Sequence, residues 1–515
     1  MLIAFLAKEI KSHLMTFRFM AALLVTFLLI VLSVWVLGND FVLRNQLYIK
    51  LSESYIEQSD VVYVPSQFSP MMHKPPTPMS IFAQGKEKRL GNAVVFSRWS
   101  VPSDAIDQLT NNKLTADRLS YDLMTIFILI ISLFSLLITY DAFSGERETG
   151  TLRLLCSFGL SRASIFTVKF IAGFVVISLP FIISFVSALL VLQFVHAIAF
   201  TGAQWLAIAL IVFACLIYCA VFIVIGLVCS AVSNRSSSSL VLALFFWALA
   251  VILIPALGNS MAKFFAPLLP PEEIEQLELQ TAAELKVILA KYMEEETPNI
   301  GGSWQGAYIL DEKVSLFDTF SVDGYNDILQ YARYQERLKQ ERAERIWNAK
   351  RNHVVREKEQ AELAAILSSI SPAFQLRDVF TRLSGTGFKE YDIFLDGCRR
   401  YRQAVLQDFQ RRGYFDRNIH DLFMRLPKEY FSSDEVIRNR WRDYLARRDS
   451  GVPLQDILTW VGRYEPLRED LFPQFHYRGA QPDFNAALWP IAFLTLAAAV
   501  IFFFGFAVFI RYDVR

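Results

Sequence analysis

The sequence predicts a mainly α-helical membrane protein with six spans, a large and mostly helical water-exposed insertion, and a smaller insertion of mixed α/β character. Hydrophobic residues make up 54% of the 515 residues, which is more than a soluble globular protein usually carries. Charged residues still make up 20%, so the charge must be segregated into water-facing parts. The net charge of +1 gives no reason to expect nucleic acid as a partner.

Six apolar runs set the number of spans. A helix needs about 20 apolar residues to cross roughly 30 Å of hydrocarbon. The runs of this length are Phe19–Leu37, Leu123–Tyr140, Ile165–Val195, Trp205–Cys229, Leu240–Leu257 and Leu488–Ile510. With their ends, they place the spans at residues 17–38, 122–140, 165–196, 204–229, 238–258 and 488–510. The first run is too long for a signal peptide and has no A-x-A cleavage site, so we interpret it as an uncleaved anchor.

The charges next to the spans predict the orientation. Residues 1–16 are expected to form an amphipathic helix on the membrane surface, because apolar and charged residues alternate there at helical spacing. Lys and Arg gather in this segment, in the loop of residues 141–164 and in the tail of residues 511–515. The positive-inside rule therefore places all three in the cytoplasm. The insertions of residues 39–121 and 259–487 are then extracytoplasmic.

The two insertions differ in pattern. The first contains two short β-like segments, VVYVPSQFSP and NAVVFSRW, around the proline-rich turn HKPPTPMS. In the second, Tyr325–Ile370 has no proline or glycine, which predicts one or two long helices that end before Ser371-Pro372. A helix packed on its own domain is favoured over a coiled coil, because no strict heptad persists. Pro180 and Pro255 are expected to kink or terminate the third and fifth helices.

Several chemistries have no support in the sequence. The spans have almost no Asp, Glu, Lys or Arg away from their ends, whereas ion-coupled carriers and proton relays need such residues at membrane depth. No GxxxxGK[ST] loop occurs, so the chain is not expected to be an ATPase itself. The His and Cys residues lack metal-ligand spacing. We therefore predict no catalytic, cofactor-binding or metal-binding residues.

The loop between the second and third spans carries a distinctive pattern. It reads DAFSGERETGTLRLLCSFGLSR from Asp141 to Arg162, and Lys169 opens the next span. This stretch resembles the signature of the ABC-2 type permeases, the membrane subunits of a class of ATP-driven exporters. That family usually has a proline before the Ser-Arg pair, where this chain has Gly159-Leu160. The departure affects the expected turn geometry and leaves the resemblance intact.

Three further segments resemble a subgroup with large extracytoplasmic insertions, which includes the gliding-motility and nitrous-oxide-related permeases. They are PPTPMSIFAQG at Pro75–Gly85, SPAFQLRDVFTRLSGTGFKEYDIF at Ser371–Phe394 and the tail RYDVR at Arg511–Arg515. The resemblance implies a six-helix permease fold of the type V exporter kind in a bacterial inner membrane.

The resemblance also implies a role for the polar loop, because in this family it forms a coupling helix that docks on a separate ATP-binding subunit. The residues to which it assigns ATPase coupling are Glu146, Arg147, Glu148, Gly150, Thr151, Leu152, Leu154, Leu155, Ser161 and Arg162. Glu146 and Glu148 would suit a helix N-terminus, and the leucines would offer an apolar contact face. Residues 1–16 would be the family's connecting helix. The alternative is an ordinary positive-inside loop that contacts no partner.

These patterns together predict a non-enzymatic permease subunit of an ATP-driven transporter. Its expected partners are an ATP-binding subunit that holds ATP and Mg, a second permease chain, identical or related, membrane lipid and an extracytoplasmic protein. The first alternative is a mechanotransmitter that drives an extracytoplasmic complex without moving a substrate. The second is a membrane-anchored receptor with no ATPase. The sequence does not identify a substrate.

Overall fold

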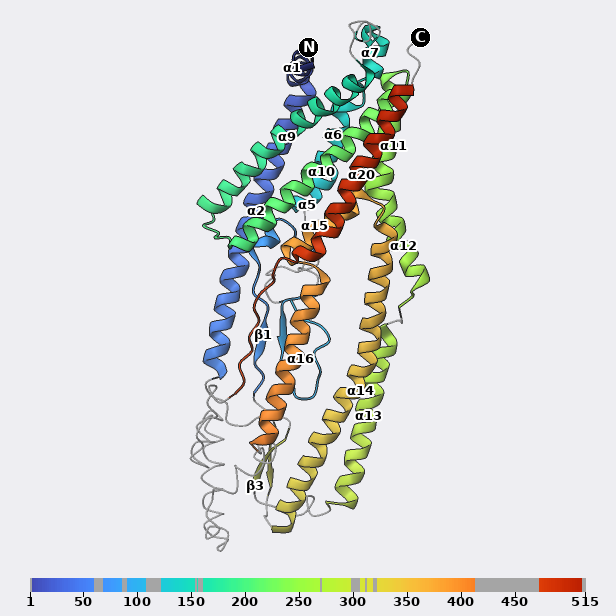
Figure 1. Cartoon of the computed structure of the whole chain (residues 1–515). Helices are drawn as coiled ribbons and strands as arrows, with labels where there is room; N and C mark the ends of the chain where they lie inside the picture. The colour runs from blue at the N-terminus through green and yellow to red at the C-terminus, as the bar shows by residue number, and fades with distance from the viewer. Residues whose placement is uncertain are drawn as a thin grey trace.

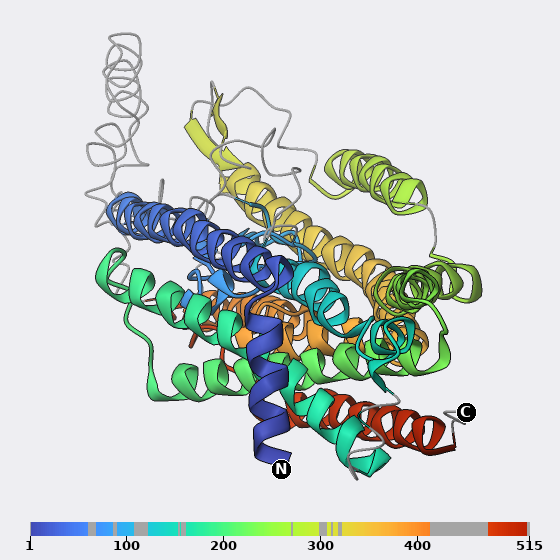
Figure 2. The same ribbon diagram turned by 90° about the horizontal axis from the view of Figure 1, so that it is seen from above.

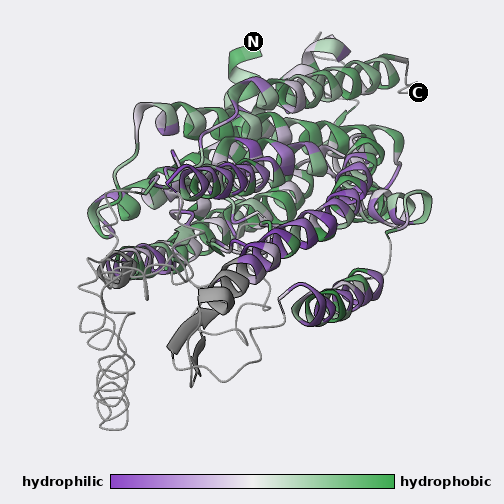
Figure 3. Ribbon diagram, turned by 90° about the horizontal axis from the view of Figure 1, so that it is seen from below, coloured by the Kyte–Doolittle hydropathy of each residue, from purple (hydrophilic) through white to green (hydrophobic). Residues whose placement is uncertain are grey.

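The protein is an elongated helical molecule, with apolar helices gathered at one end and polar helices extending from the other (Figures 1 and 3). The computed structural model describes residues 2–59, 68–85, 90–107, 122–152, 155, 161–268, 271–297, 306–310, 313–317, 322–412 and 472–511. Both sheets in these ranges are two-stranded and antiparallel. They pair β1 (Met71–His73) with β2 (Ala93–Val95), and β3 (Gly306–Leu310) with β4 (Lys313–Phe317).

Among the described residues, six helical stretches are long and apolar enough to cross a membrane. The first is α2 (Phe17–Ser59), and the second combines α5 (Leu123–Ile126), η3 (Phe127–Ile131) and α6 (Ser132–Thr139). The third is α9 (Arg162–Phe194) and the fourth is α10 (Gly202–Val232). The fifth combines α11 (Ser236–Ala248), η4 (Leu249–Leu253) and α12 (Ile254–Phe265), and the sixth is α20 (Phe484–Arg511). We number these six spans in the same order. The predicted mainly α-helical, six-span fold is confirmed.

The helices extend further than the hydropathy of the sequence indicated. The first helix continues past the predicted span end at residue 38 as far as Ser59. Neither proline ends its helix, because α9 runs through Pro180, and a π-helical turn before Pro255 leads directly into α12. A helix satisfies nearly all its backbone groups internally, so among packed apolar helices one missing amide hydrogen costs less than unwinding the chain.

The N-terminal segment forms the predicted helix, α1 (Leu2–Leu14), which lies across the end of the helix bundle (Figure 2). The chain turns at Met15 and Thr16, and the Thr16 hydroxyl caps the break by donating to His13 O at 2.6 Å. Phe5 and Glu9 form the buried face of α1, which packs against α9. A short helix, α7 (Ser144–Glu148), lies at the same end of the bundle (Figure 1).

A polar arm extends from the opposite end of the bundle. We use this name for α13 (Pro271–Glu295), α14 (Val322–Ser368), α16 (Phe388–Arg411) and the β1–β2 hairpin. The stretch predicted as one or two helices is the single 47-residue helix α14. Ion pairs fasten α13 alongside it, with Lys350 Nζ 2.8 Å from Glu278 and Arg345 Nη1 3.2 Å from Glu284.

The arm has an aromatic core of its own. Phe68 and Phe96, which flank the hairpin strands, pack with Phe394 and Phe409 of α16 and with Phe472. Strand β2 lies within the predicted segment NAVVFSRW. Most of the other predicted segment, VVYVPSQFSP, falls on residues 60–67, which lie outside the described ranges. The hairpin therefore closes against a helix that is almost 300 residues away in the sequence.

The helix α15 (Pro372–Ser384) anchors the arm in the bundle. Its buried face, which includes Leu376 and Phe380, belongs to the same core as the spans. The ring of Phe380 lies 5.8 Å from that of Phe127 in the second span. The 3-10 turn η2 (Pro78–Ile81), with Phe82 beside it, joins this contact from the first insertion. Two of the segments singled out by their sequence thus meet at one end of the bundle.

Candidate coupling site

The short helix α7 connects the second span to the third and is bound to the fourth. The backbone amides of Phe143 and Ser144 donate to Ser230 Oγ at 2.9 and 3.0 Å. Ser230 lies near the end of α10 and is fully buried. One hydroxyl therefore satisfies two amides at the start of α7, where no intrahelical acceptor exists. The bonds fix where α7 lies relative to the fourth span.

Glu146 belongs to a buried ionic cluster. Lys169 Nζ lies 2.8 Å from Glu146 Oε1 and 3.4 Å from Glu9 Oε2. The Lys169 side chain is 3% exposed, and its ammonium also lies 5.7 Å from the centre of the Phe143 ring. A cation this well buried is stable only with its anionic partners in place. The cluster therefore ties α7, α9 and α1 together.

Arg147 and Glu148 bind the ends of α10 and α11. Arg147 donates to the carbonyls of Ser233 and Ala231 at 2.5 and 3.0 Å, at the C-terminal end of α10. Glu148 accepts from the amide and the hydroxyl of Ser236 at 3.0 and 2.9 Å, at the start of α11. The positive charge of Arg147 thus lies at the negative C-terminal end of the α10 dipole, and the negative charge of Glu148 lies at the positive N-terminal end of the α11 dipole.

These contacts correct one prediction. Glu148 was expected to stabilise the N-terminus of its own helix, but it is the last residue of α7. Its carboxylate stabilises the N-terminus of α11 instead, which is 88 residues away in the sequence. Only Glu146 lies in the first turn of α7, as expected. A charge pattern read along a sequence cannot identify which helix end a side chain reaches.

The leucines correct a second prediction. Leu152 is 2% exposed and belongs to the core of the bundle, so it is no contact face for a partner. Leu155 is half-buried and packs against that core. Leu154 lies outside the described residues. Leu152 and Leu155 anchor the loop because leucines next to an apolar bundle are most stable within it.

The remaining predicted residues divide between a surface turn and a helix start. Gly150 has a φ of +73°, a conformation that favours glycine, and Thr151 Oγ1 donates to Glu146 O at 3.3 Å. Ser161 caps α9 by accepting from the Ser164 amide at 3.1 Å. Arg162 Nη1 donates to Ile510 O at 2.9 Å, near the end of α20. The Ser161 bond lies within the start of α9 and the Arg162 bond joins the third span to the sixth, so neither of these bonds reaches α7.

We define the coupling tip as the four consecutive residues Glu148, Thr149, Gly150 and Thr151. All four are exposed. Among the described residues, a Cβ placed on Gly150 would meet no atom within 4 Å, so the tip is open at this position. In the part of the chain that the structure describes, the tip is held by the internal bonds of α7 and by the bonds of Glu148 to Ser236, and the exposed surface of Thr149, Gly150 and Thr151 is free for contact.

Sequence reasoning missed three residues of this site: Glu9, Ser230 and Ser236. Glu9 is the single acidic residue of α1, whose other charged residues are basic, and this is a weak signal for an ion-pair partner. Ser230 gave no signal, because serines at span ends are common, and the run Ser236–Ser239 indicated only a flexible entry into the fifth span. Lys169 was noted as the residue opening the third span, but its two partners lie 160 and 23 residues away.

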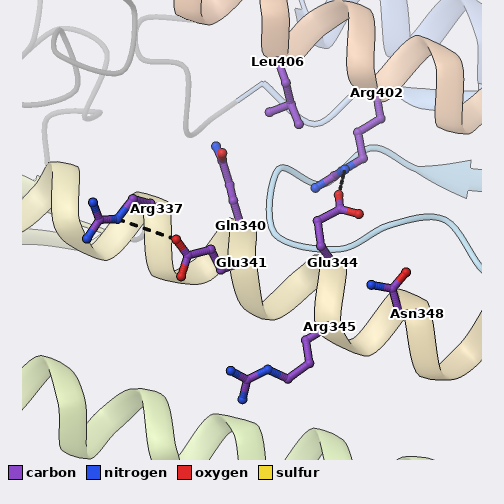
Figure 4. A pocket seen from close by; sticks show the side chains of 8 residues that line it. All are labelled: Arg337, Gln340, Glu341, Glu344, Arg345, Asn348, Arg402 and Leu406. Atoms are coloured by element: carbon purple, nitrogen blue, oxygen red, sulfur yellow. Dashed lines mark hydrogen bonds and ion pairs between the residues drawn. The ribbon is translucent and has the colours of Figure 1, made fainter.

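The polar arm carries a pocket of about 480 Å³ between α14 and α16 (Figure 4). Its charged side chains are paired with one another or with neighbours. Arg402 lies 3.2 Å from Glu344, and Arg337 lies 3.7 Å from Glu341. Within the described ranges, no group of three His, Cys, Asp or Glu side chains is placed to hold a metal ion.

Comparison with known proteins identifies the family. The model described as "ABC-2 family transporter protein" matches residues 3–372, which include α1, α7 and the first five spans. The chain belongs to the ABC-2 family. A second family model, described as "Domain of unknown function (DUF3526)", matches residues 322–433 and so includes α14, α15 and α16. This ABC-2 protein is therefore a multi-pass transmembrane permease of the ABC transporter type.

One curated relative of the permease is "Probable ABC transporter permease protein NosY" from Stutzerimonas stutzeri. It is 32% identical over 146 residues, which make up 27% of this chain and 53% of the relative. The chain thus spans about half the length of the curated relative it matches.

Proposed function

We propose that this permease receives force at the coupling tip from a separate ATP-binding subunit and passes it to the spans. The observation that carries the proposal is the set of bonds made by three consecutive residues of α7. Glu146 binds α9 and α1 through Lys169, Arg147 binds the end of α10, and Glu148 binds the start of α11. A displacement of α7 therefore acts on four other helices at once.

The orientation we propose places the coupling tip, α1 and the C-terminus in the cytoplasm of a bacterial cell and the polar arm outside the inner membrane. Its support is the excess of Lys and Arg near α1 and α7, together with the end of α20 lying on the same side (Figure 1). In this orientation α1 is the connecting helix on the membrane surface. Its buried Glu9 gives α1 a direct bond to the ionic cluster.

In the proposed complex the chain itself is non-catalytic. ATP and Mg are held by the ATP-binding subunit, and a second permease chain, identical or related, completes the pair of membrane subunits. The proposed direction of transport is export. Of the residues assigned to coupling from the sequence, Ser161 caps the start of α9 and Arg162 holds α9 in place against α20.

A second function is favoured by the arm. Helix α14 is one 47-residue helix, and α15 seats its base in the core of the spans. Movement of the spans would therefore be carried to the far end of the arm, as a mechanotransmitter requires. Vesicles containing the purified complex separate the two functions, because only a transporter moves a substrate across the membrane when ATP is added.

The direct test places a long charged side chain on the coupling tip. Thr151→Arg should sharply reduce both the recovery of the ATP-binding subunit with the chain and the effect of the chain on ATP hydrolysis. The matched control is Gln280→Arg, which adds the same side chain to an exposed position of α13 in the arm. Equal recovery of the ATP-binding subunit with both variants would contradict the proposal.

A further inference from the structure

The fifth span contains a backbone irregularity with a local cause. Its middle segment, η4, is a π-helical turn in which the Ile254 amide bonds Leu249 O, five residues back. In a regular α-helix that amide would bond Ala250 O instead. The next residue, Pro255, has no amide hydrogen to offer. The Ala250 carbonyl is therefore left without a donor from its own helix.

A serine from the base of the arm supplies the missing donor. Ser371 Oγ donates to Ala250 O at 2.5 Å and accepts from the Phe374 amide at 3.2 Å. Ser371 is fully buried and is the N-cap of α15, three residues after α14 ends at Ser368. In an apolar setting an unbonded carbonyl is strongly destabilising, so this contact is favoured. The bond joins the fifth span to the point where the arm enters the bundle.

The neighbouring contacts make the joint tight. A Cβ on Gly258 would lie only 2.2 Å from Ser368 Oγ, so α12 and the end of α14 approach as closely as a glycine permits. Trp247 Nε1 donates to Ser132 Oγ at 2.8 Å, which links the fifth span to the second. Ser132 directly follows η3, the π-helical turn of the second span. Mid-helix π turns frequently occur where a helix has a functional role.

We propose that Ser371 is a positioning residue that makes the fifth span and the polar arm move as one unit. This inference rests on the proposed function, because it concerns where force from α7 goes next. The route runs from the coupling tip through Glu148 to the start of α11, along the fifth span to Ala250, and through Ser371 into α14 and α15. Without the Ser371 hydroxyl the arm keeps its fold and its packing on α12 but loses the hydrogen bond that fixes its position against Ala250.

The test measures hydrogen exchange in the complex of the chain with its ATP-binding subunit in lipid nanodiscs, with and without ATP and vanadate. In the wild type, trapping the nucleotide should change amide exchange both at residues 144–152 and in the arm at residues 322–411. Ser371→Gly removes the hydroxyl but remains an acceptable N-cap. It should abolish the nucleotide-dependent change in the arm and preserve the change at residues 144–152.

Two further variants distinguish a positioning role of Ser371 from a general effect on the stability of the chain. Ser371→Thr keeps a hydroxyl and should restore the response of the arm. The double variant Pro255→Ala with Ser371→Gly returns an amide hydrogen to the fifth span, so the helix can satisfy its own carbonyls, but the bond to the arm is still absent. It should be as stable as the wild type and should still lack the response of the arm. Ser260→Ala is the control, since its hydroxyl donates to Ala256 O of its own helix.

The outcomes distinguish this inference from the proposed function. A response of the arm in Ser371→Gly, or in the double variant, would overturn the inference and leave the coupling site intact. The same holds if the wild-type arm does not respond while residues 144–152 do. A wild-type complex with no nucleotide response at residues 144–152 would overturn the proposed function and the inference with it.

Discussion

Removing the Lys169 ammonium should be the most damaging single change at the α7 end of the bundle. Lys169→Met keeps the length and apolar body of the side chain but leaves Glu146 and Glu9 without their shared cation. Lys169 is 3% exposed, and the side chains of Glu9 and Glu146 are 9% and 20% exposed, so little water can replace it. Breaking a buried ion pair by removing one partner costs about 3–5 kcal/mol. Because Glu146 keeps some contact with water, we expect about 3 kcal/mol, the lower end of that range.

The assay is thermal unfolding of the purified chain in detergent. The rate of ATP hydrolysis by the complex is measured separately. Lys169→Met should melt well below the wild type, and adding Glu146→Gln should recover part of the loss, because one uncompensated charge is removed. Lys11→Met is the matched control, since Lys11 is exposed on α1. The reasoning is refuted if Lys169→Met melts no lower than Lys11→Met.

Three further perturbations test other parts of the same region. Gly150→Ala should cost about 1 kcal/mol through its φ of +73° and weaken binding of the ATP-binding subunit, measured by titration. Gly226→Ala should destabilise the bundle by about 1–3 kcal/mol, because the new Cβ would lie 2.2 Å from Thr139 Oγ1, whereas Gly202→Ala, which meets no atom within 4 Å, should melt as the wild type. Burial lowers the pKa of His13 below its usual value of 6.5, so the unfolded chain takes up this proton at a higher pH than the folded chain does. The neutral His13 therefore leaves the folded state fully stable above pH 6.5, and the free energy of unfolding declines as the pH falls below that value. His13→Asn should remove that part of the acid sensitivity in melting curves, and an unchanged pH profile would contradict the assignment.

The sequence predicted the features that depend on local pattern. Spans follow from runs of about 20 apolar residues, and α14 follows from a long stretch without proline or glycine. The surface helix α1 follows from its alternating charged and apolar residues. In each case the information lies within one continuous segment, so the neighbours in the fold are not needed.

The partners of the charged loop could not be predicted in the same way. Lys169 meets Glu9 across 160 residues, and Glu148 meets Ser236 across 88. Such contacts depend on how the helices pack, and one sequence gives no register for that packing. Leu152 was assigned to a surface for the same reason, since its burial depends on the surrounding spans.

Pro255 is an intermediate case. Its sequence position signals that one backbone bond is missing, and the structure confirms a local irregularity there. The sequence did not indicate whether the helix would stop, bend or shift its register. That outcome depends on Ser371, because a donor at the right place allows the helix to continue.

The length of α14 converts a small tilt at its base into a larger displacement of its far end. Its 47 residues extend for about 70 Å, so a tilt of roughly 5° at its base would carry its far end about 6 Å sideways. A rearrangement no larger than a side-chain repacking near Gly258 would therefore become a displacement as large as a whole turn of helix. Small motions of the bundle would therefore be easiest to detect as displacements of the far end of α14.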